Sequence, residues 1–488
     1  MIEFTGRQLE EITGGTLTGC EQSHLFKVPQ FFVDSRSAIR DGVFVALVGE
    51  RVDGHDFLDS VYEAGAALAI VDTAVGRPMA EGLSVLRVVS PLNALAQIAH
   101  WVRVNVLTAQ VIGVTGSSGK TSTKDLIAGI LGQRGETVAP PGSFNTEVGL
   151  PLTILSADAS TQFLVLEMGM RGIGHVSTLA EIAEPDIGVV VNVGSAHIEL
   201  LGSIENIAEA KSELVRALPA TGTAILNKDD PLVAKMGDSL NCEIRTFGED
   251  KGSDFRASDV DIEPDGTTRF VITHGGQSHW AHVKLVGSHY VSNALAAVSA
   301  CVCAGVPFEA ACELLSKVHM ISKWRMEVTT AGNDVTVIND SYNANPESMR
   351  AALTTLAQFR VGDSDRRTWA VLGEMRELGE YSREAHESIG RLAVRLNISR
   401  LVCVGEATRV MALAAVSEGS WGGESVWVSD TDEALELLAR DLRAGDIVLV
   451  KASRSIGLER VASEVMELSL SSLTTDWDSG SGRGQGNL

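Results

Sequence analysis

Apolar runs alternate with helix-like stretches along most of the chain, and their spacing divides it into three units. The first unit opens with apolar runs at 42–47 and 67–71, which predict short buried strands. A helix is predicted over 91–104, and this unit is expected to end near residue 105.

The second unit has longer apolar strands. Buried strands are predicted at 111–114, 163–166 and 187–191. Such runs, alternating with helices, are typical of a mainly parallel sheet with both faces covered. Residues 242–286 show short alternating strands with turns and predict an antiparallel flap. A helix from about 292 to 304 then leads towards a boundary near Val318.

The third unit repeats the α/β pattern. Strands are predicted at 335–338, 368–372, 401–404 and 447–450. The last stretch, 469–488, is rich in Ser, Gly, Thr and Asp and has little to bury, so it predicts a disordered tail.

Composition narrows the possible functions. The 488 residues are 44% hydrophobic and 21% charged, as in a globular protein, with a formal net charge of −23. That charge argues against a nucleic-acid-binding surface, which needs clustered Lys and Arg. We find no apolar stretch of membrane-spanning length and no secretory signal at the N-terminus. Six scattered cysteines without CxxC spacing predict reduced thiols, a cytoplasmic location and no zinc site.

The strongest local signal is the run from Gly113 to Thr121, with the sequence GVTGSSGKT. An apolar strand feeds a glycine loop, and a helix begins where the loop ends. Loop amides and a helix N-terminus suit phosphate oxygens, Lys120 can reach the outer phosphates, and the Thr121 hydroxyl can bind Mg²⁺. The strict P-loop pattern has glycine where this chain has Val114, so this is a variant loop. The alternative is an ordinary Gly/Ser turn before a helix.

Two further polar residues follow predicted strands. Glu167 ends the run 163–166, and His197 follows a short turn after 187–191. Both are expected at the carboxyl ends of strands beside the phosphate loop, where open α/β sheets bind ligands. Each could hold a divalent cation there, although alone either would be read as a polar strand-end residue.

Other candidates stay ambiguous from spacing. Asn145 could be a turn-former, and Lys211 would by default be a solvated helix lysine. The segment from Asp340 to Pro346 could be a plain Asx turn and helix cap.

Together these stretches resemble the Mur ligase family over essentially the whole chain except the tail. The resemblance rests on Thr115–Thr121, Leu166–Met170, Asn192–His197, Ala210–Lys211, His289–Ala297, Trp324–Glu327 and Asp340–Pro346. It implies an α/β protein of three domains: a UDP-sugar-binding domain at 1–105, a central P-loop-type ATP-binding domain at 106–318 and a Rossmann-like domain at 319–468.

The resemblance also implies roles for single residues. The loop residues Thr115, Gly116, Ser117, Ser118, Gly119, Lys120 and Thr121 would hold the ATP phosphates. Thr121 and Glu167 would hold one Mg²⁺, and His197 with a carbamylated Lys211 would serve a second. Asn293 would face the adenine, Arg325 would reach the γ-phosphate and Asp340 would contact the ribose. The substrate-binding residues would be Asp34, Ser35, Arg36, Asn145, Asn343 and Asn345.

The implied activity is ADP-forming ligation in peptidoglycan precursor synthesis. Within the family, the runs Phe144–Gly149, Glu167–Gly169, Asn343–Pro346 and Leu372–Gly379 favour UDP-N-acetylmuramoyl-tripeptide and D-alanyl-D-alanine as substrates. The enzyme is expected to act as a monomer without nucleic acid or membrane insertion. The alternatives are another ligase of the family, tripeptide-forming or folylpolyglutamate-type, and a nucleotide-gated switch using the same loop.

Overall fold

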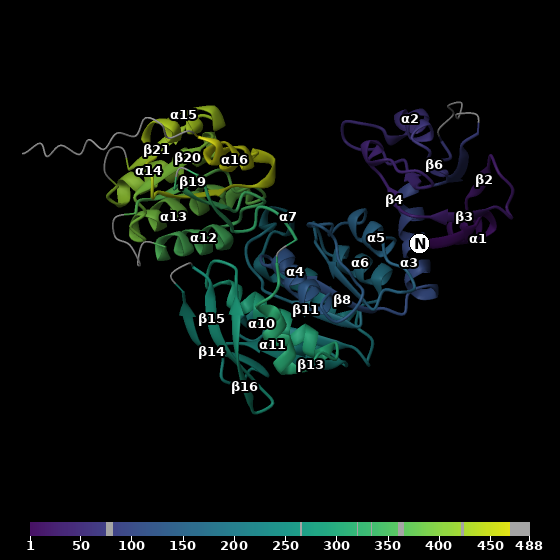
Figure 1. Ribbon diagram of the computed structural model, residues 1–488, viewed down its shortest axis with the longest axis horizontal. Coiled ribbons are helices and arrows are strands. Elements are labelled where there is room, and N and C mark those ends of the chain that lie inside the picture. Colours follow the sequence, from purple (N-terminus) through teal and green to yellow (C-terminus); the bar gives the residue numbers. More distant parts are fainter. Residues whose placement is uncertain are drawn as a thin grey trace, which may run out of the picture. The chain divides into compact units, whose positions relative to one another are not determined.

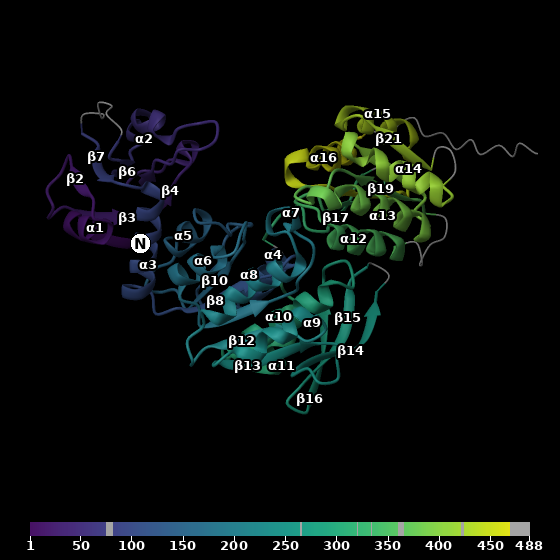
Figure 2. The ribbon, with the colours of Figure 1, turned by 180° about the vertical axis from the view of Figure 1, so that it is seen from behind.

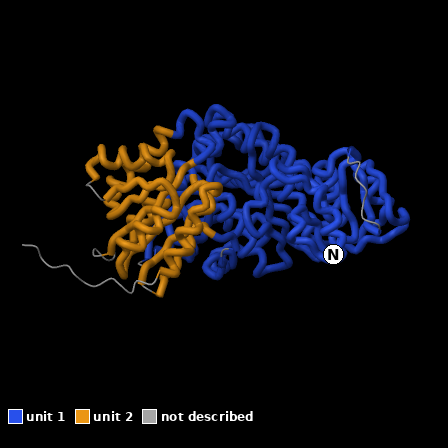
Figure 3. Tube along the Cα trace, turned by 90° about the horizontal axis from the view of Figure 1, so that it is seen from above, with its two compact units in different colours: residues 1–323, 345–351, 376–382 blue, residues 324–344, 352–375, 383–488 orange. Residues whose placement is uncertain are grey.

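The computed structural model describes residues 1–74, 82–263, 266–319, 321–332, 334–359, 366–420 and 424–468. The predicted disordered tail, 469–488, lies outside them. The chain forms two compact units (Figure 3). Unit 1 comprises 1–323, 345–351 and 376–382, and unit 2 comprises 324–344, 352–375 and 383–488. The two units are described separately below.

Unit 1 begins with a small α/β region built on two sheets. In the five-stranded sheet the order is β2 (Thr16–Thr18), β7 (Ser84–Val88), β6 (Leu68–Asp72), β5 (Val43–Val45) and β4 (Phe31–Phe32), parallel except for β2. The pair β1 (Ile2–Thr5) and β3 (Leu25–Val28) is antiparallel. Helices α1 (Gly6–Thr13), α2 (Leu58–Glu63) and α3 (Pro91–Asn105) accompany them. The strands expected at 42–47 and 67–71 and the helix at 91–104 are present as β5, β6 and α3.

The start of α3 follows from its sequence. The Ser90 hydroxyl accepts a hydrogen bond from the Asn93 amide, and Pro91 occupies the first helical position. Proline fits there because its missing N–H would have no partner within the helix.

The central sheet of unit 1 has nine strands (Figures 1 and 2). Its order is β16 (Gln277–Val283), β15 (Thr268–His274), β14 (Phe255–Ile262), β13 (Glu243–Gly248), β12 (Thr223–Asn227), β11 (Ile187–Val190), β8 (Gln110–Thr115), β10 (Phe163–Glu167) and β9 (Thr137–Val138). Pairing is parallel from β9 to β14 and antiparallel from β14 to β16. The antiparallel flap expected over 242–286 therefore starts only at β14, because Glu243–Gly248 pairs parallel with β12.

Every residue of β11 and β12 is buried. A strand buried at successive positions is covered on both faces, as predicted for this sheet. The helices of this region are α4 (Lys120–Leu131), α5 (Gly149–Ile154), α6 (His175–Ala183), α7 (Ile198–Leu201), α8 (Ile204–Arg216), α9 (Pro231–Ala234), α10 (Tyr290–Cys303) and α11 (Phe308–Leu315).

Unit 2 contains a six-stranded sheet. Its order is β17 (Glu327–Thr330), β18 (Thr336–Asn339), β22 (Ile447–Lys451), β19 (Thr368–Leu372), β20 (Arg400–Val404) and β21 (Ser425–Val428), with β17 alone antiparallel. The third-unit helices are α12 (Pro346–Gln358), α13 (Ser382–Arg395), α14 (Arg409–Glu418), α15 (Thr431–Asp441) and α16 (Glu459–Glu467). All four strands expected in this part of the chain are present. Buried residues such as Trp369, Val371, Val402 and Val448 form its core.

Short 3₁₀ helices complete the described chain: η1 (Ser35–Ser37), η2 (Gly54–Phe57), η3 (Lys235–Ser239), η4 (Gly379–Tyr381), η5 (Glu406–Thr408) and η6 (Arg454–Ile456). No helix in the described ranges has the length and apolar character needed to cross a membrane.

The order of the central strands locates the ligand site. Strand β8 lies between β10 and β11. The chain leaves β8 through α4 towards β9 and β10 on one side, and then crosses from β10 through α6 to β11 on the other side. Open α/β sheets bind ligands at such a switch point, beyond the carboxyl ends of the strands.

Candidate active site

The loop between β8 and α4 forms a tight cradle at this switch point. Gly119 has φ +78°, and a Cβ added there would lie 2.4 Å from Oδ1 of Asn293. The left-handed backbone favours glycine, and any larger residue would also displace the Asn293 carboxamide. The Lys120 ammonium donates to the Gly116 carbonyl at 2.8 Å, so its side chain folds back over the loop.

Asn192, just past β11, holds the loop in place. Its Oδ1 accepts from the amides of Ser117 at 3.1 Å and Ser118 at 2.9 Å, and its Nδ2 donates to the Ser118 carbonyl at 3.1 Å. Two of the loop amides predicted to meet phosphate thus bind a side chain in this structure. The N-terminus of α4 also lies at this loop, and helix N-termini of this kind bind anions. The sequence motif contained Asn192, but spacing gave no indication of this contact.

Thr121 and Glu167 are brought together, as predicted. The Thr121 hydroxyl donates to Oε2 of Glu167 at 2.8 Å, and the Asn145 amide donates to Oε1 at 2.7 Å. Ser143 Oγ lies 2.9 Å from the Thr121 hydroxyl. Glu167 is only 1% exposed at the end of β10. Asn145 is thus more than a turn-former, because its side chain fixes the carboxylate.

This oxygen cluster fits Mg²⁺. The cation usually takes one or two carboxylates and completes its shell with phosphate oxygens and water. A hydroxyl and a carboxylate beside a phosphate loop provide that set. Among the described residues, no group of three or more His, Cys, Asp or Glu side chains could hold a metal alone.

His197 pairs with a different carboxylate. It has φ +67° at the start of α7, and its Nδ1 is 2.5 Å from Oε2 of Glu377. The bond from His197 lowers the pKa of the Glu377 carboxyl. Sequence reasoning assigned no role to Glu377, which lies far along the chain. In the described structure no hydrogen bond or ion pair joins His197 to Glu167 or Lys211.

Lys211 is not a solvated helix lysine. It is 1% exposed within α8, and the nearest partner for its Nζ is the Met170 sulfur at 3.9 Å. Burial, together with the charge of Lys120, holds the pKa of Lys211 well below its ordinary value. A lysine in this setting favours the neutral, nucleophilic amine.

Asn293 extends from α10 and is 5% exposed. Its carboxamide lies directly against Gly119, as the short Cβ distance shows. The predicted contact of Asn293 with adenine stays a prediction.

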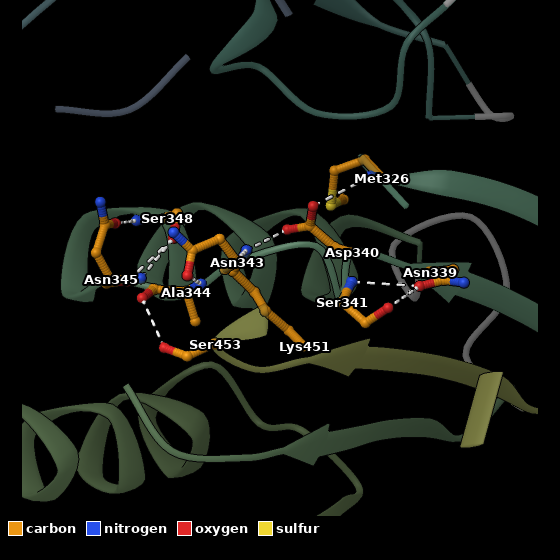
Figure 4. Close-up of polar contacts among 10 residues, drawn as sticks. All are labelled: Met326, Asn339, Asp340, Ser341, Asn343, Ala344, Asn345, Ser348, Lys451 and Ser453. Atoms are coloured by element: carbon orange, nitrogen blue, oxygen red, sulfur yellow. Dashed lines mark hydrogen bonds and ion pairs between the residues drawn. The ribbon is translucent and has the colours of Figure 1, made fainter. Parts of the chain in front are cut away.

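Three predicted residues, Arg325, Asp340 and Asn343, belong to unit 2. Figure 4 shows Asp340 and Asn343 with their polar contacts. Oδ1 of Asp340 accepts from the Met326 amide at 3.2 Å, and Oδ2 lies 2.5 Å from the Lys451 ammonium. The guanidinium carbon of Arg325 lies 4.2 Å from the centre of the Tyr342 ring. The Asn343 side chain accepts from the Ala344 amide at 2.9 Å.

Asn345 adopts the cap geometry that was the alternative for its segment. Its Oδ1 accepts from the Ser348 amide at 2.8 Å, immediately before α12. This contact satisfies an amide in the first turn of the helix.

Asp34, Ser35 and Arg36 lie at the start of η1 in the N-terminal region. Arg36 donates to both carboxylate oxygens of Asp34, and these bonds lower the pKa of Asp34 to about 2. Nearby, the buried His55 contacts Asp53 at 2.6 Å and accepts from the Asp72 amide at 3.1 Å.

Known families match most of the chain. Residues 114–301 match the Mur ligase middle domain, and residues 324–454 match the Mur ligase glutamate ligase domain. A relative from Mycobacterium bovis, named UDP-N-acetylmuramoyl-tripeptide–D-alanyl-D-alanine ligase, is 43% identical and covers 95% of this chain and 97% of its own. A Bacillus subtilis relative of the same name is 34% identical, covering 96% and 100%.

Solved structures agree. MurF from Acinetobacter baumannii superimposes with a TM-score of 0.83 at 29% identity, covering 96% of this chain and 99% of its own. MurF ligase from Thermotoga maritima in complex with ADP gives a TM-score of 0.75 at 29% identity, covering 90% and 97%. The chain belongs to the Mur ligase family. The α/β fold class and the family predicted from the sequence are confirmed.

Proposed function

We propose that the chain is an ATP-dependent, ADP-forming ligase that joins D-alanyl-D-alanine to UDP-N-acetylmuramoyl-tripeptide in peptidoglycan precursor synthesis. Relatives of that name, matching over nearly the whole length at up to 43% identity, confirm the sequence-based prediction of this activity. The structural observation that carries it is the phosphate loop with Thr121 and the buried Glu167 at one sheet edge.

The reaction makes a carboxylate electrophilic in two steps. A carboxylate oxygen of the tripeptide attacks the γ-phosphorus, and the bond to ADP breaks. The dipeptide amine then attacks the acyl carbon, loses a proton, and phosphate leaves with the C–O electron pair. Catalysis of this kind consists mainly of positioning and of neutralising phosphate charge.

The residues present can supply those functions. Lys120 and the α4 amides bind phosphate oxygens, and Arg325 adds a positive charge at the transferred group. Thr121 and Glu167 would hold Mg²⁺, which would neutralise phosphate charge. Asn293 and Asp340 bind the nucleoside. Asp34, Ser35 and Arg36 bind the UDP-sugar, while Asn145, Asn343 and Asn345 lie near the peptide substrates.

We also propose that Lys211 is carbamylated and, with His197, serves a second Mg²⁺. The amine attacks the carbon of CO₂, an N–C bond forms, and the released proton passes to solvent. Burial favours this chemistry because it keeps the amine neutral. The carbamate also converts the neutral amine into a group that carries an oxygen anion, a ligand type that Mg²⁺ prefers.

The three-domain division, with units at 1–105, 106–318 and 319–468, is part of the proposal. The separate N-terminal sheet supports it. A cytoplasmic monomer that binds neither nucleic acid nor membrane is proposed as well. All six cysteines are free thiols, which is usual for reducing compartments.

Phosphate release and product mass test the activity together. The protein is incubated with ATP and Mg²⁺, with and without UDP-N-acetylmuramoyl-tripeptide and D-alanyl-D-alanine. We expect negligible release until both acceptor substrates are present, and then a product carrying the added dipeptide. Turnover without either substrate would instead favour a nucleotide-gated switch, and a different accepted amine would favour another ligase of the family.

A further inference from the structure

The turn before β17 carries unusual backbone strain. Trp324 has φ +60° and Met326 has φ +50°, so two non-glycine residues in the left-handed region flank Arg325. Side chains with a Cβ disfavour this conformation, and it persists only where surrounding contacts impose it. The strain therefore points to contacts that hold Arg325 in one place.

The turn is fastened to the segment after β18. The Met326 amide donates to Oδ1 of Asp340 at 3.2 Å, and the Tyr342 amide donates to the Trp324 carbonyl at 3.3 Å. The Trp324 amide donates in turn to the Glu327 carboxylate at 3.2 Å. The bond from Met326 to Asp340 is thus made at one of the strained residues itself.

Lys451, at the end of β22, anchors the carboxylate (Figure 4). Its ammonium lies 2.5 Å from Oδ2 of Asp340 and donates to the Asn343 carbonyl at 2.9 Å. Lys451 is 1% exposed and Asp340 is 7% exposed. The two oxygens of the Asp340 carboxylate therefore have different partners. One contacts the Lys451 ammonium, and the other accepts from the Met326 amide of the strained turn.

Two arginines stack on aromatic rings at this turn. The Arg325 guanidinium lies over Tyr342 at 4.2 Å, and the Arg454 guanidinium lies over Trp324 at 4.3 Å. Stacking on a ring restricts the plane of a guanidinium without using its hydrogen-bond donors. The Tyr342 ring consequently aligns the Arg325 guanidinium. The hydrogen bond from the Met326 amide to Asp340 fixes the backbone next to Arg325.

We propose that Lys451 is a positioning residue for Arg325, acting through Asp340 and the Met326 amide. The lysine is buried and its contacts are to protein groups, so it serves the reaction by fixing the turn. The ion pair compensates the buried Asp340 charge, which lets one carboxylate oxygen hold the Met326 amide. The catalytic importance of Arg325 rests on the proposed function, whereas the fixing of the turn does not.

The matched control is another ion pair of unit 2 that has a buried carboxylate. Arg367 pairs with the buried Asp446 at 2.6 Å, away from the turn. Lys451→Met and Arg367→Met each remove the cation from a buried carboxylate. Both variants are expected to lose thermal stability, so stability alone does not distinguish them.

Hydrogen exchange at the Met326 amide tests the positioning directly. We expect faster exchange in Lys451→Met and wild-type protection in Arg367→Met. Unchanged protection at Met326 in folded Lys451→Met would overturn the proposal. If Lys451→Met does not fold, Lys451→Gln is used, with the same expected increase in exchange. This measurement needs no turnover, so it stands even if the proposed ligase activity fails.

A double-mutant cycle then tests the link to Arg325. Lys451→Met is expected to lower kcat at saturating substrates by about 10- to 100-fold, the effect of misplacing a catalytic group. In an Arg325→Ala background the same change should alter kcat by less than about twofold, because the group to be positioned is absent. If the kcat losses of the two single variants simply multiply in the double variant, Lys451 does not act through Arg325.

Discussion

Lys211 and Lys124 are both helix lysines of unit 1 with almost no exposed surface, yet their surroundings are opposite. Lys124, in α4, lies 2.6 Å from Oδ1 of Asp125 and donates to the Pro140 carbonyl at 2.6 Å. Lys211, in α8, has the Met170 sulfur at 3.9 Å and the charge of Lys120 near it.

The difference separates a structural lysine from a reactive one. A buried ammonium with an anion and carbonyls around it is compensated by those partners. One without an anion is driven towards the neutral amine, which is costly for stability but useful for chemistry. Burial alone therefore does not identify function; the partners of the buried group do.

The largest expected effect is on turnover at Lys211. Lys211→Met should lower kcat by about 100- to 1,000-fold, as expected for losing a key electrostatic group, while the thermal transition stays equal or rises. Lys211→Ala should regain part of its activity with added acetate, which supplies the missing oxygens. A fully active Lys211→Arg variant would contradict the carbamate, because arginine does not take up CO₂ in this way.

Lys124 should respond in the opposite sense. Lys124→Met leaves the Asp125 carboxylate buried without its cation, which should cost about 3–5 kcal/mol of unfolding free energy. Urea denaturation measures this. The double change Lys124→Met/Asp125→Leu should recover part of the loss, since no buried charge remains. An unchanged denaturation midpoint in the single variant would remove the contrast between the two lysines.

The pH dependence of stability sharpens the comparison further. The folded-state pKa of Lys211 is well below the ordinary value of 10.5. In the pH window between these two pKa values, the unfolded chain binds a proton that the folded chain does not. Wild-type stability should therefore gain with rising pH from this residue, up to about pH 10. In CO₂-free buffer, the stability advantage of Lys211→Met should be largest at the low end of the window and shrink towards its top. An advantage independent of pH would show that Lys211 is charged when folded.

The smallest effect on stability is expected at an exposed pair. Arg36 and Asp34 form their contacts in solvent, so Arg36→Ala should leave the thermal transition within error. Affinity for the UDP-linked substrate should nevertheless fall by roughly tenfold, because a charge-assisted contact is lost. Calorimetric titration with that substrate measures this, and unchanged affinity would exclude Arg36 from the substrate site.

Much of the fold and part of the site could be read from the sequence. One apolar strand leads to Gly119 and Lys120, and another ends at Glu167. These residues were predicted to lie at the same edge of the sheet, because parallel strands bring their carboxyl ends together. The contact between Thr121 and Glu167 followed from that topology.

Other contacts had no local signal. Asn192 on the loop amides, Glu377 beside His197 and Lys451 beneath Asp340 all join segments that are distant in sequence. The burial of Lys211 was equally hidden, because a lysine among mixed neighbours in a helix resembles an exposed one until tertiary packing is known. The adjacent opposite charges of Lys124 and Asp125, followed directly by the apolar residues Leu126 and Ile127, could have indicated an internal ion pair.

The close approach of Asn293 to Gly119 constrains which sequences this fold can use. A side chain at position 119 would have to adopt the left-handed backbone and would displace the Asn293 carboxamide, so added bulk there disturbs the loop and its neighbour together. A ligand seated on the phosphate loop at this point therefore faces a position where a single substitution that adds bulk strains the loop itself as well as the ligand site.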